Sequence, residues 1–153
     1  MDLRELYQQV ILDHNRNPRN FREVEPCDCS ADGENPLCGD KITIFLSMDR
    51  DTVKDIAFQG AGCAICMASA SMMTERLRGC ERTEAEAIFE EFHTLVTGVE
   101  ELDNRKNRTD SILEKLEVFS GVREFPVRVK CASLPWHTFK AALDNSSKKV
   151  TTE

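Results

Sequence analysis

The sequence lacks a hydrophobic stretch of membrane-spanning length, an apolar signal-peptide core and an excess of basic residues. No apolar run approaches the roughly 20 residues that a transmembrane helix needs. The first ten residues, MDLRELYQQV, alternate charged and apolar side chains. We therefore expect a cytoplasmic protein without a membrane partner. The formal net charge of -7 argues against nucleic acid as a partner, because phosphate binding requires a concentrated surface of lysine and arginine.

The composition is otherwise that of an ordinary globular domain. The chain has 153 residues, of which 41 % are hydrophobic and 31 % are charged. A chain of this length can bury a core without disulfide bonds. We expect one domain over residues 1–153, in which a metal can serve function as well as folding.

Cysteine is the residue type that stands out. In a reducing compartment cysteines are more often metal ligands or reactive thiols than disulfide partners, and an odd number cannot pair completely. The chain contains seven, at positions 27, 29, 38, 63, 66, 80 and 131. This pattern favours thiol or metal chemistry over a disulfide framework.

Hydrophobic periodicity predicts one helix and three strands in the N-terminal half. Apolar residues recur every three or four positions from Leu3 to Ile11, which predicts an amphipathic helix ending near the Asn- and Pro-rich segment 15–20. Apolar residues alternate over 42–48, Asp49 to Asp51 supplies a turn, and a second strand follows over 53–59. Cys27 and Cys29 alternate too, so we expect a third strand over about 24–31.

The C-terminal half reads as helices joined by polar segments. A helix is predicted after Gly60-Ala61-Gly62 and stops at Gly79, and Thr83 with Glu86 forms a capping box for the next helix. Residues 98–109 are polar and charged and read as a loop or inserted segment. Ser111 with Glu114 is predicted to cap another short helix. Residues 125–130 are predicted to be extended. The last helix is expected to follow them, with Trp136 and Phe139 in the core, and the tail 145–153 is expected to fray.

Three cysteines lie at junctions between predicted elements, where side chains can converge. Cys38 precedes the first hairpin strand, Cys63 lies between a strand and a helix, and Cys131 precedes the last helix. Asp40 can bring a carboxylate to the same centre. Thiolates suit zinc and iron-sulfur clusters, and a carboxylate generally makes a more exchangeable fourth ligand. Helix N-termini at Cys63 and Cys131 would favour thiolates, although separate buried cysteines explain the spacing equally well.

Local motifs favour the metal interpretation. The segments ENPLCGDKI, GAGCAICMASASMMTE and FPVRVKCASLPW, with DHNRNPRN at the end of the first helix, closely resemble the NifU N-terminal and IscU-like iron-sulfur assembly family. The resemblance runs from about Leu3 to Leu143. It implies an α+β fold, a small three-stranded antiparallel sheet packed with helices, and a site made of Cys38, Asp40, Cys63 and Cys131.

Two departures indicate the SufU branch of this family. Lys130 stands where housekeeping scaffolds have histidine, and extra residues lie near 98–109. Lys130 with Arg128 is also placed to offset the negative charge of the site. The resemblance implies a zinc-dependent sulfurtransferase that accepts persulfide sulfur from a SufS-type cysteine desulfurase and passes it to the SUF assembly machinery. We expect Cys38 to be the acceptor, because it lies in a glycine-containing loop whose backbone can move further than the positions of Cys63 and Cys131. Two alternatives stay open, a scaffold for a transient iron-sulfur cluster on the same residues and a structural zinc domain for protein contacts.

The roles of the other cysteines stay undecided at this point. Cys63 and Cys66 form a C-x-x-C spacing that is either a redox or metal pair, or small-residue filling of the helix. Cys27 and Cys29 form either a second metal site or packing contacts. Cys80 is read as incidental. The histidines, at 14, 93 and 137, lie away from the motifs and are not expected to be ligands.

Overall fold

The computed structural model describes residues 3–24, 27–97, 119, 121–122, 125–144 and 150–151. The predicted insertion at 98–109 and the short helix predicted from Ser111 lie outside these residues. So do residues 145–149 and 152–153 of the predicted tail.

Three antiparallel strands form the sheet, as predicted. They are β1 (Cys29–Asn35), β2 (Asp40–Asp49) and β3 (Thr52–Ala61). A two-residue strand, β4 (Val150–Thr151), pairs in parallel with β1 and gives the order β3-β2-β1-β4. Part of the C-terminal tail is therefore held on the edge of the sheet.

The third strand starts later than the sequence predicted. The expected range was 24–31, whereas β1 begins at Cys29 and continues to Asn35, opposite Asp40. Cys27 lies before the strand. The alternation of cysteines was misleading, because the position of β1 is fixed by its backbone pairing with β2. The register of β2 is itself fixed by its buried face, on which Ile42, Ile44 and Leu46 are each 2 % exposed or less.

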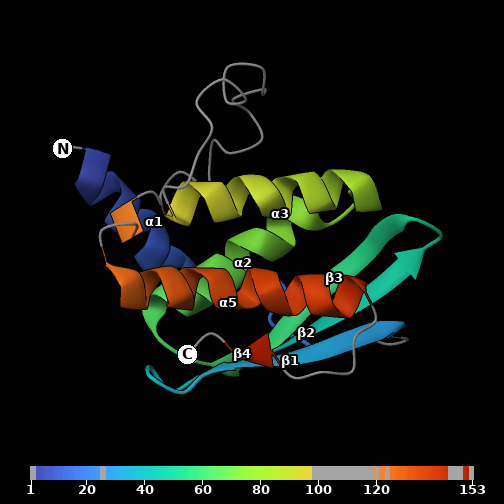
Figure 1. The fold of residues 1–153 in the computed structure, drawn as a ribbon, viewed down its shortest axis with the longest axis horizontal. Helices are drawn as coiled ribbons and strands as arrows, with labels where there is room; N and C mark the ends of the chain where they lie inside the picture. The colour runs from blue at the N-terminus through green and yellow to red at the C-terminus, as the bar shows by residue number, and fades with distance from the viewer. Residues whose placement is uncertain are drawn as a thin grey trace.

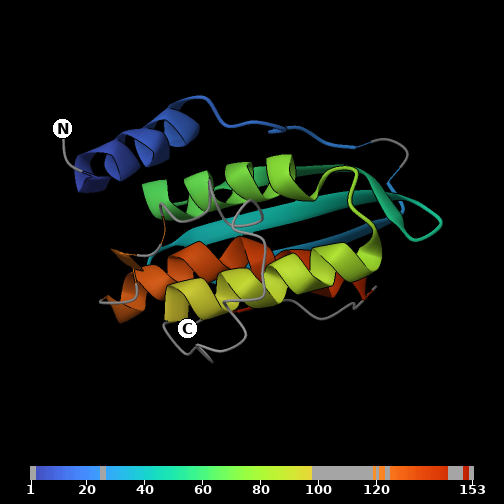
Figure 2. The ribbon, with the colours of Figure 1, turned by 90° about the horizontal axis from the view of Figure 1, so that it is seen from above.

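Four helices are described, and they lie on one side of the sheet (Figures 1 and 2). Helices α2 (Ala64–Leu77) and α5 (Pro126–Leu143) pack against the strands and against each other. Helix α1 (Leu3–Arg16) packs on α2, and α3 (Arg82–Thr97) packs on α5. Among the described residues, no helix is long and apolar enough to cross a membrane.

Helix α5 corrects the prediction for residues 125–130. That segment was expected to be extended because of its proline and valines, but the helix already begins at Pro126. Proline at the first helical position loses no hydrogen bond and has a φ angle suited to a helix. Cys131 consequently lies inside the helix and not before it. Helix α3 likewise begins at Arg82, so Thr83 lies within its first turn and is not its cap.

The predicted core residues are buried. Trp136 is 1 % exposed, stacks on Phe92 with ring centroids 4.3 Å apart, and donates its indole N–H to Ser69 Oγ at 3.1 Å. Phe139 and Met72 are also buried. These contacts fix α5 and α2 side by side, which places the ends of both helices relative to the sheet.

Candidate metal centre

The turn between β1 and β2 positions the first two candidate ligands. Residues 36–39 form the turn, and Gly39 adopts φ +72°, a conformation that side-chain-bearing residues rarely adopt. Asn35 accepts the backbone N–H of Cys38 on its carbonyl oxygen and that of Leu37 on its side-chain oxygen, both at 3.2 Å. The turn therefore holds Cys38 half-buried and Asp40 fully buried.

Asp40 connects this turn to the start of α2. Its Oδ1 accepts the backbone N–H of Cys63 at 2.8 Å, and its Oδ2 lies 4.0 Å from Cys63 Sγ. A Cβ atom on Gly62 would lie 2.6 Å from Asp40 Oδ1. Glycine at position 62 is thus required for the carboxylate to occupy this place.

Cys63 is the N-cap of α2, in agreement with the predicted junction. Its backbone is extended, with φ -70° and ψ 166°, and its Sγ accepts the N–H of Cys66 at 3.4 Å. Hydrogen bonding from the Cys131 thiol, together with the N–H groups of Cys66 and Ile65, lowers the pKa of Cys63 to about 7 against the opposing effects of burial and Asp40. The Cys63 thiol therefore loses its proton more readily than the Cys131 thiol does.

Cys131 approaches the same point from the second turn of α5. It is 2 % exposed, its Sγ lies 3.3 Å from Cys38 Sγ, and Asn35 Nδ2 donates to it at 3.7 Å. Donation of its S–H to Cys63, followed by burial, raises the pKa of Cys131. The prediction that a helix N-terminus favours its thiolate is wrong, because Cys131 lies inside the helix.

The four predicted residues meet where the β1–β2 turn, the start of α2 and the second turn of α5 come together. The potential ligand atoms of Cys38, Asp40 and Cys131 all lie within 4.8 Å of one another. Cys63 adjoins them through the Asp40 contacts and the Cys131 hydrogen bond. Three sulfurs and one carboxylate in this arrangement fit a zinc ion or an iron-sulfur cluster chemically.

The two basic residues that were predicted to offset the negative charge of the site lie in different surroundings. The Arg128 guanidinium lies over the Phe125 ring, 4.5 Å from its centroid, and its side chain is exposed. Lys130 is half-buried next to Cys131 in the helix. The stacking of Arg128 on Phe125 places its charge on the outer surface of α5.

The other cysteines occupy different surroundings. Cys66 is fully buried in the first turn of α2, three residues after the N-cap Cys63. Cys27 is exposed and donates its S–H to the Cys29 carbonyl at 3.0 Å, at the end of β1 opposite to Asn35. Cys80 is buried and donates to the Arg76 carbonyl at 3.3 Å. Within the described residues, the group at Cys38 is the only one of three or more potential ligands that could hold a metal ion.

The histidines lie outside the centre, as predicted. His93 and His137 pack together with ring centroids 5.7 Å apart, on α3 and α5. Burial, followed by the nearby His93, lowers the pKa of His137. His14 is buried between α1 and α2, with its Nδ1 2.8 Å from Ser71 Oγ.

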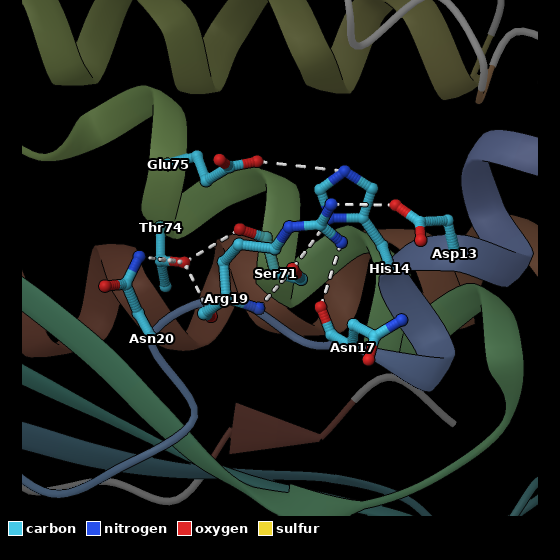
Figure 3. A network of polar contacts seen from close by, with 8 residues as sticks. All are labelled: Asp13, His14, Asn17, Arg19, Asn20, Ser71, Thr74 and Glu75. Atoms are coloured by element: carbon cyan, nitrogen blue, oxygen red, sulfur yellow. Dashed lines mark hydrogen bonds and ion pairs between the residues drawn. The ribbon is translucent and has the colours of Figure 1, made fainter.

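Figure 3 shows what the DHNRNPRN segment does in the fold. The backbone N–H of Arg19 donates to Ser71 Oγ at 2.8 Å, so the Ser71 hydroxyl proton is available for His14 Nδ1. We therefore assign the N–H of His14 to Nε2, which faces Glu75 Oε1 at 3.7 Å. Asn20 Nδ2 donates to Thr74 Oγ1 at 3.1 Å. This segment anchors the end of α1 to the middle of α2.

Two residues of the centre were missed by reasoning from the sequence. Asn35 holds the Cys38 turn and donates to Cys131, and Gly62 leaves space for Asp40. Both stand inside the motifs ENPLCGDKI and GAGCAIC, so a signal was present. Their roles depend on contacts across the chain that the motif letters do not specify.

Comparison with known proteins agrees with this architecture. A family model described as the NifU-like N terminal domain matches residues 6–132. The chain is 42 % identical over 132 residues to the zinc-dependent sulfurtransferase SufU of Bacillus subtilis, covering 86 % of this chain and 84 % of the relative. It is 36 % identical over 145 residues to the iron-sulfur cluster assembly scaffold protein IscU of Streptococcus pyogenes serotype M1, covering 95 % and 87 %.

A solved structure from Fervidobacterium islandicum AW-1 superimposes on the chain with a TM-score of 0.80. It is 30 % identical, covers 93 % of this chain and 99 % of its own, and is a proposed iron-sulfur cluster assembly scaffold protein for the SUF system. The match over nearly the whole of both chains confirms the predicted α+β fold.

Proposed function

The chain belongs to the NifU-like N-terminal domain family and functions in iron-sulfur cluster assembly, and from this premise we propose that it is a zinc-dependent sulfurtransferase acting with a SufS-type cysteine desulfurase. The observation that carries the proposal is the convergence of Cys38, Asp40 and Cys131 within 4.8 Å, with Cys63 adjoining them. The sulfurtransferase branch is favoured by the 42 % identity to a zinc-dependent relative and by Lys130 before the last cysteine.

The four residues would hold the zinc ion, which supplies a positive charge that keeps the thiols deprotonated. Asp40 would be the most exchangeable ligand, because its carboxylate is the hard member of a soft set. Its second function is structural, since the same carboxylate accepts the Cys63 N–H. Substitution of Asp40 by alanine is therefore expected to alter metal exchange and slow sulfur turnover, with the fold retained.

Cys38 is the proposed sulfur acceptor. It lies on a turn preceding Gly39, whereas Cys63 and Cys131 are held by helices. In the transfer, the Cys38 thiolate attacks the outer sulfur of the desulfurase persulfide. A new S–S bond forms on Cys38, the S–S bond of the enzyme breaks, and the enzyme cysteine leaves as a thiolate. No external oxidant is consumed.

Two exposed apolar side chains, one next to Cys38 in sequence and one a helical turn before Cys131, fit a protein partner. Leu37, next to Cys38, is 65 % exposed, and Val127, one helical turn before Cys131, is 51 % exposed. We assign these two side chains to the contact surface for the desulfurase. A reducing compartment, the cytoplasm, would keep the thiols available, and components of the SUF machinery would receive the sulfur.

A second candidate is a scaffold that holds a transient iron-sulfur cluster on the same residues. It is supported by the 36 % identity to IscU over 95 % of the chain. The two functions differ in the metal and sulfur content of the purified protein. One firmly bound zinc per chain supports the sulfurtransferase, whereas iron with labile sulfide in anaerobic preparations supports the scaffold. Cobalt substitution followed by absorption spectroscopy tests the ligand set, with Cys27 and Cys29 as the rival thiols.

The sulfur acceptor is tested with the desulfurase and radiolabelled cysteine. We expect Cys38→Ser to lose the protein-bound sulfur and the stimulation of the enzyme while still docking. Cys80→Ser is the control and should retain the bound sulfur and the stimulation, because the Cys80 thiol donates to the Arg76 carbonyl and is not part of the centre. Full label in the Cys38 variant, with loss in a Cys131 or Cys66 variant, would move the acceptor to that residue.

A further inference from the structure

Cys66 is a fourth thiol beside the three cysteines of the metal centre, and the proposed function does not use it. It follows Cys63 by three residues, which places the two side chains on the same face at the start of α2. The backbone N–H of Cys66 donates to Cys63 Sγ at 3.4 Å, so the Cys63 sulfur is directed over the first turn of the helix. Cys66 is 0 % exposed, and Cys63 is partly exposed.

We propose that Cys63 and Cys66 form a dithiol-disulfide pair, which closes on oxidation and removes Cys63 from the metal-ligand set. A C-x-x-C pair at a helix N-terminus combines an accessible first cysteine with a buried second one. The first can react with an external disulfide, and the second, which is shielded from solvent, can react with a neighbouring cysteine. Both positions in this chain have the exposure that these roles require.

The chemistry needs one external oxidant, a small disulfide such as oxidised glutathione. The Cys63 thiolate attacks the disulfide, forms a mixed disulfide and releases one glutathione thiolate. The Cys66 thiol then attacks Cys63 Sγ, the mixed disulfide breaks, and the second glutathione leaves with the Cys66 proton. Two protein thiols are oxidised and one glutathione disulfide is reduced, so electrons and atoms balance.

The arrangement of the centre favours this pairing over the alternatives. The sulfurs of Cys38 and Cys131 lie 3.3 Å apart, so Cys131, which also hydrogen-bonds with Cys63, has Cys38 as a disulfide partner. Cys63 is directed toward α2 by the Cys66 N–H. With Cys66, the local thiols number four, and oxidation can pair all of them without leaving an isolated cysteine exposed to irreversible oxidation.

The test is disulfide mapping of the full-length chain after treatment with oxidised glutathione and a metal chelator. Free thiols are alkylated, and peptides are identified by mass spectrometry. We expect a crosslinked Cys63–Cys66 peptide in the wild type that disappears on reduction with dithiothreitol. In Cys66→Ala this peptide is lost, and glutathione remains attached to Cys63, because the thiol assigned to displace it is absent and Cys131 has Cys38 as its neighbour.

Cys80→Ala is the matched control, since it also removes a buried cysteine, and it should form the crosslink as the wild type does. Alanine suits position 66, because α2 already buries Ala68 and Ala70, and thermal unfolding verifies that both variants fold. Linkage of Cys63 to Cys38 or Cys131, or a Cys66 that stays alkylatable after Cys63 has reacted, overturns the proposal. Metal binding by the reduced protein is measured separately, so failure of this pair is distinguishable from failure of the zinc site.

Discussion

At the scale of single residues, the candidate centre depends on neighbours that are not among its four proposed ligands. Gly62 leaves the space that Asp40 fills, and Asn35 donates to Cys131 while it holds the turn that carries Cys38. Hydrogen bonds to ligand atoms fix their orientation, and their loss commonly weakens metal binding. Two substitutions separate these supporting roles from ligation itself.

Gly62→Ala should weaken zinc binding by roughly ten- to a hundredfold, as is typical when support for a ligand is lost. The new Cβ would lie 2.6 Å from Asp40 Oδ1, so the carboxylate must move away from Cys63 N–H. The affinity is measured by competition with a chromogenic chelator. Gly121→Ala is the control, because its added Cβ meets no atom of the described residues within 4 Å. Equal affinity in the two variants would show that the Asp40 position does not matter.

Asn35→Ala should lower the free energy of unfolding of the metal-free protein by about 1–3 kcal/mol. The side chain is fully buried, and its removal leaves the Leu37 N–H without its acceptor and Cys131 without its donor. Urea unfolding monitored by circular dichroism measures the change. Ser30→Ala, at an exposed position of β1, should be nearly neutral. A loss no greater than that of Ser30→Ala would contradict the role given to Asn35.

At the scale of elements, α1 is held to the rest of the protein by a few polar contacts at its C-terminal end. Ser71 in the middle of α2 accepts a hydrogen bond from the Arg19 N–H on its Oγ and donates its hydroxyl proton to His14 Nδ1 (Figure 3). Tyr7, Val10 and Ile11 pack against the core but are only partly buried. The polar anchor is therefore expected to supply an appreciable part of the docking energy of α1.

Ser71→Ala should cost about 1–3 kcal/mol in the free energy of unfolding, because the Arg19 N–H and His14 Nδ1 lose a partner in a buried site. It should also speed amide hydrogen exchange in α1 more than in β2. Ser133→Ala is a matched control, since the Ser133 hydroxyl is buried without a hydrogen bond among the described residues. Equal losses of stability in the two variants would show that the Ser71 contacts do not anchor α1.

At the scale of the whole molecule, charge pairs join segments that the sheet alone would not hold. Arg22, between α1 and the sheet, pairs with Asp55 of β3 at 2.8 Å, and Arg78 after α2 lies 3.6 Å from the same carboxylate. Hydrogen bonding from Arg22 lowers the pKa of Asp55, with partial burial opposing the shift. The unfolded chain consequently binds a proton at this residue at a higher pH than the folded chain does.

The lowered pKa of Asp55 predicts how the stability contribution of the Arg22–Asp55 pair responds to acid. Its contribution is fully present above the unfolded carboxyl pKa of about 3.9 and is lost as the pH falls through the lowered folded value. Wild type should therefore exceed Asp55→Asn in unfolding free energy by up to about 1 kcal/mol at pH 7, since the pair is partly exposed, and by less at pH 3. Urea unfolding of chelator-treated protein measures both values, with exposed Asp49→Asn as the control. A difference that does not shrink at pH 3 would refute the assignment.

The sequence by itself determined the elements whose signals are local. Alternating apolar residues specified β2 and β3, helical spacing specified α1 and α3, and the junction at Cys63 was correctly placed as the start of a helix. The motifs also indicated the family, which the family model over residues 6–132 confirms. Local periodicity suffices here because each element buries one face of its own side chains.

Only the tertiary structure decided which local preferences are overridden by packing. Valine and proline at 126–129 favour an extended chain locally, yet they form the first turn of α5, because the helix packs on α2 and the sheet. Packing also decided the start of β1, the space beside Gly62 and the donor that Asn35 offers to Cys131. Each of these features joins residues that are distant in sequence, and the free energy of such contacts depends on the positions of both partners, which a local pattern does not contain.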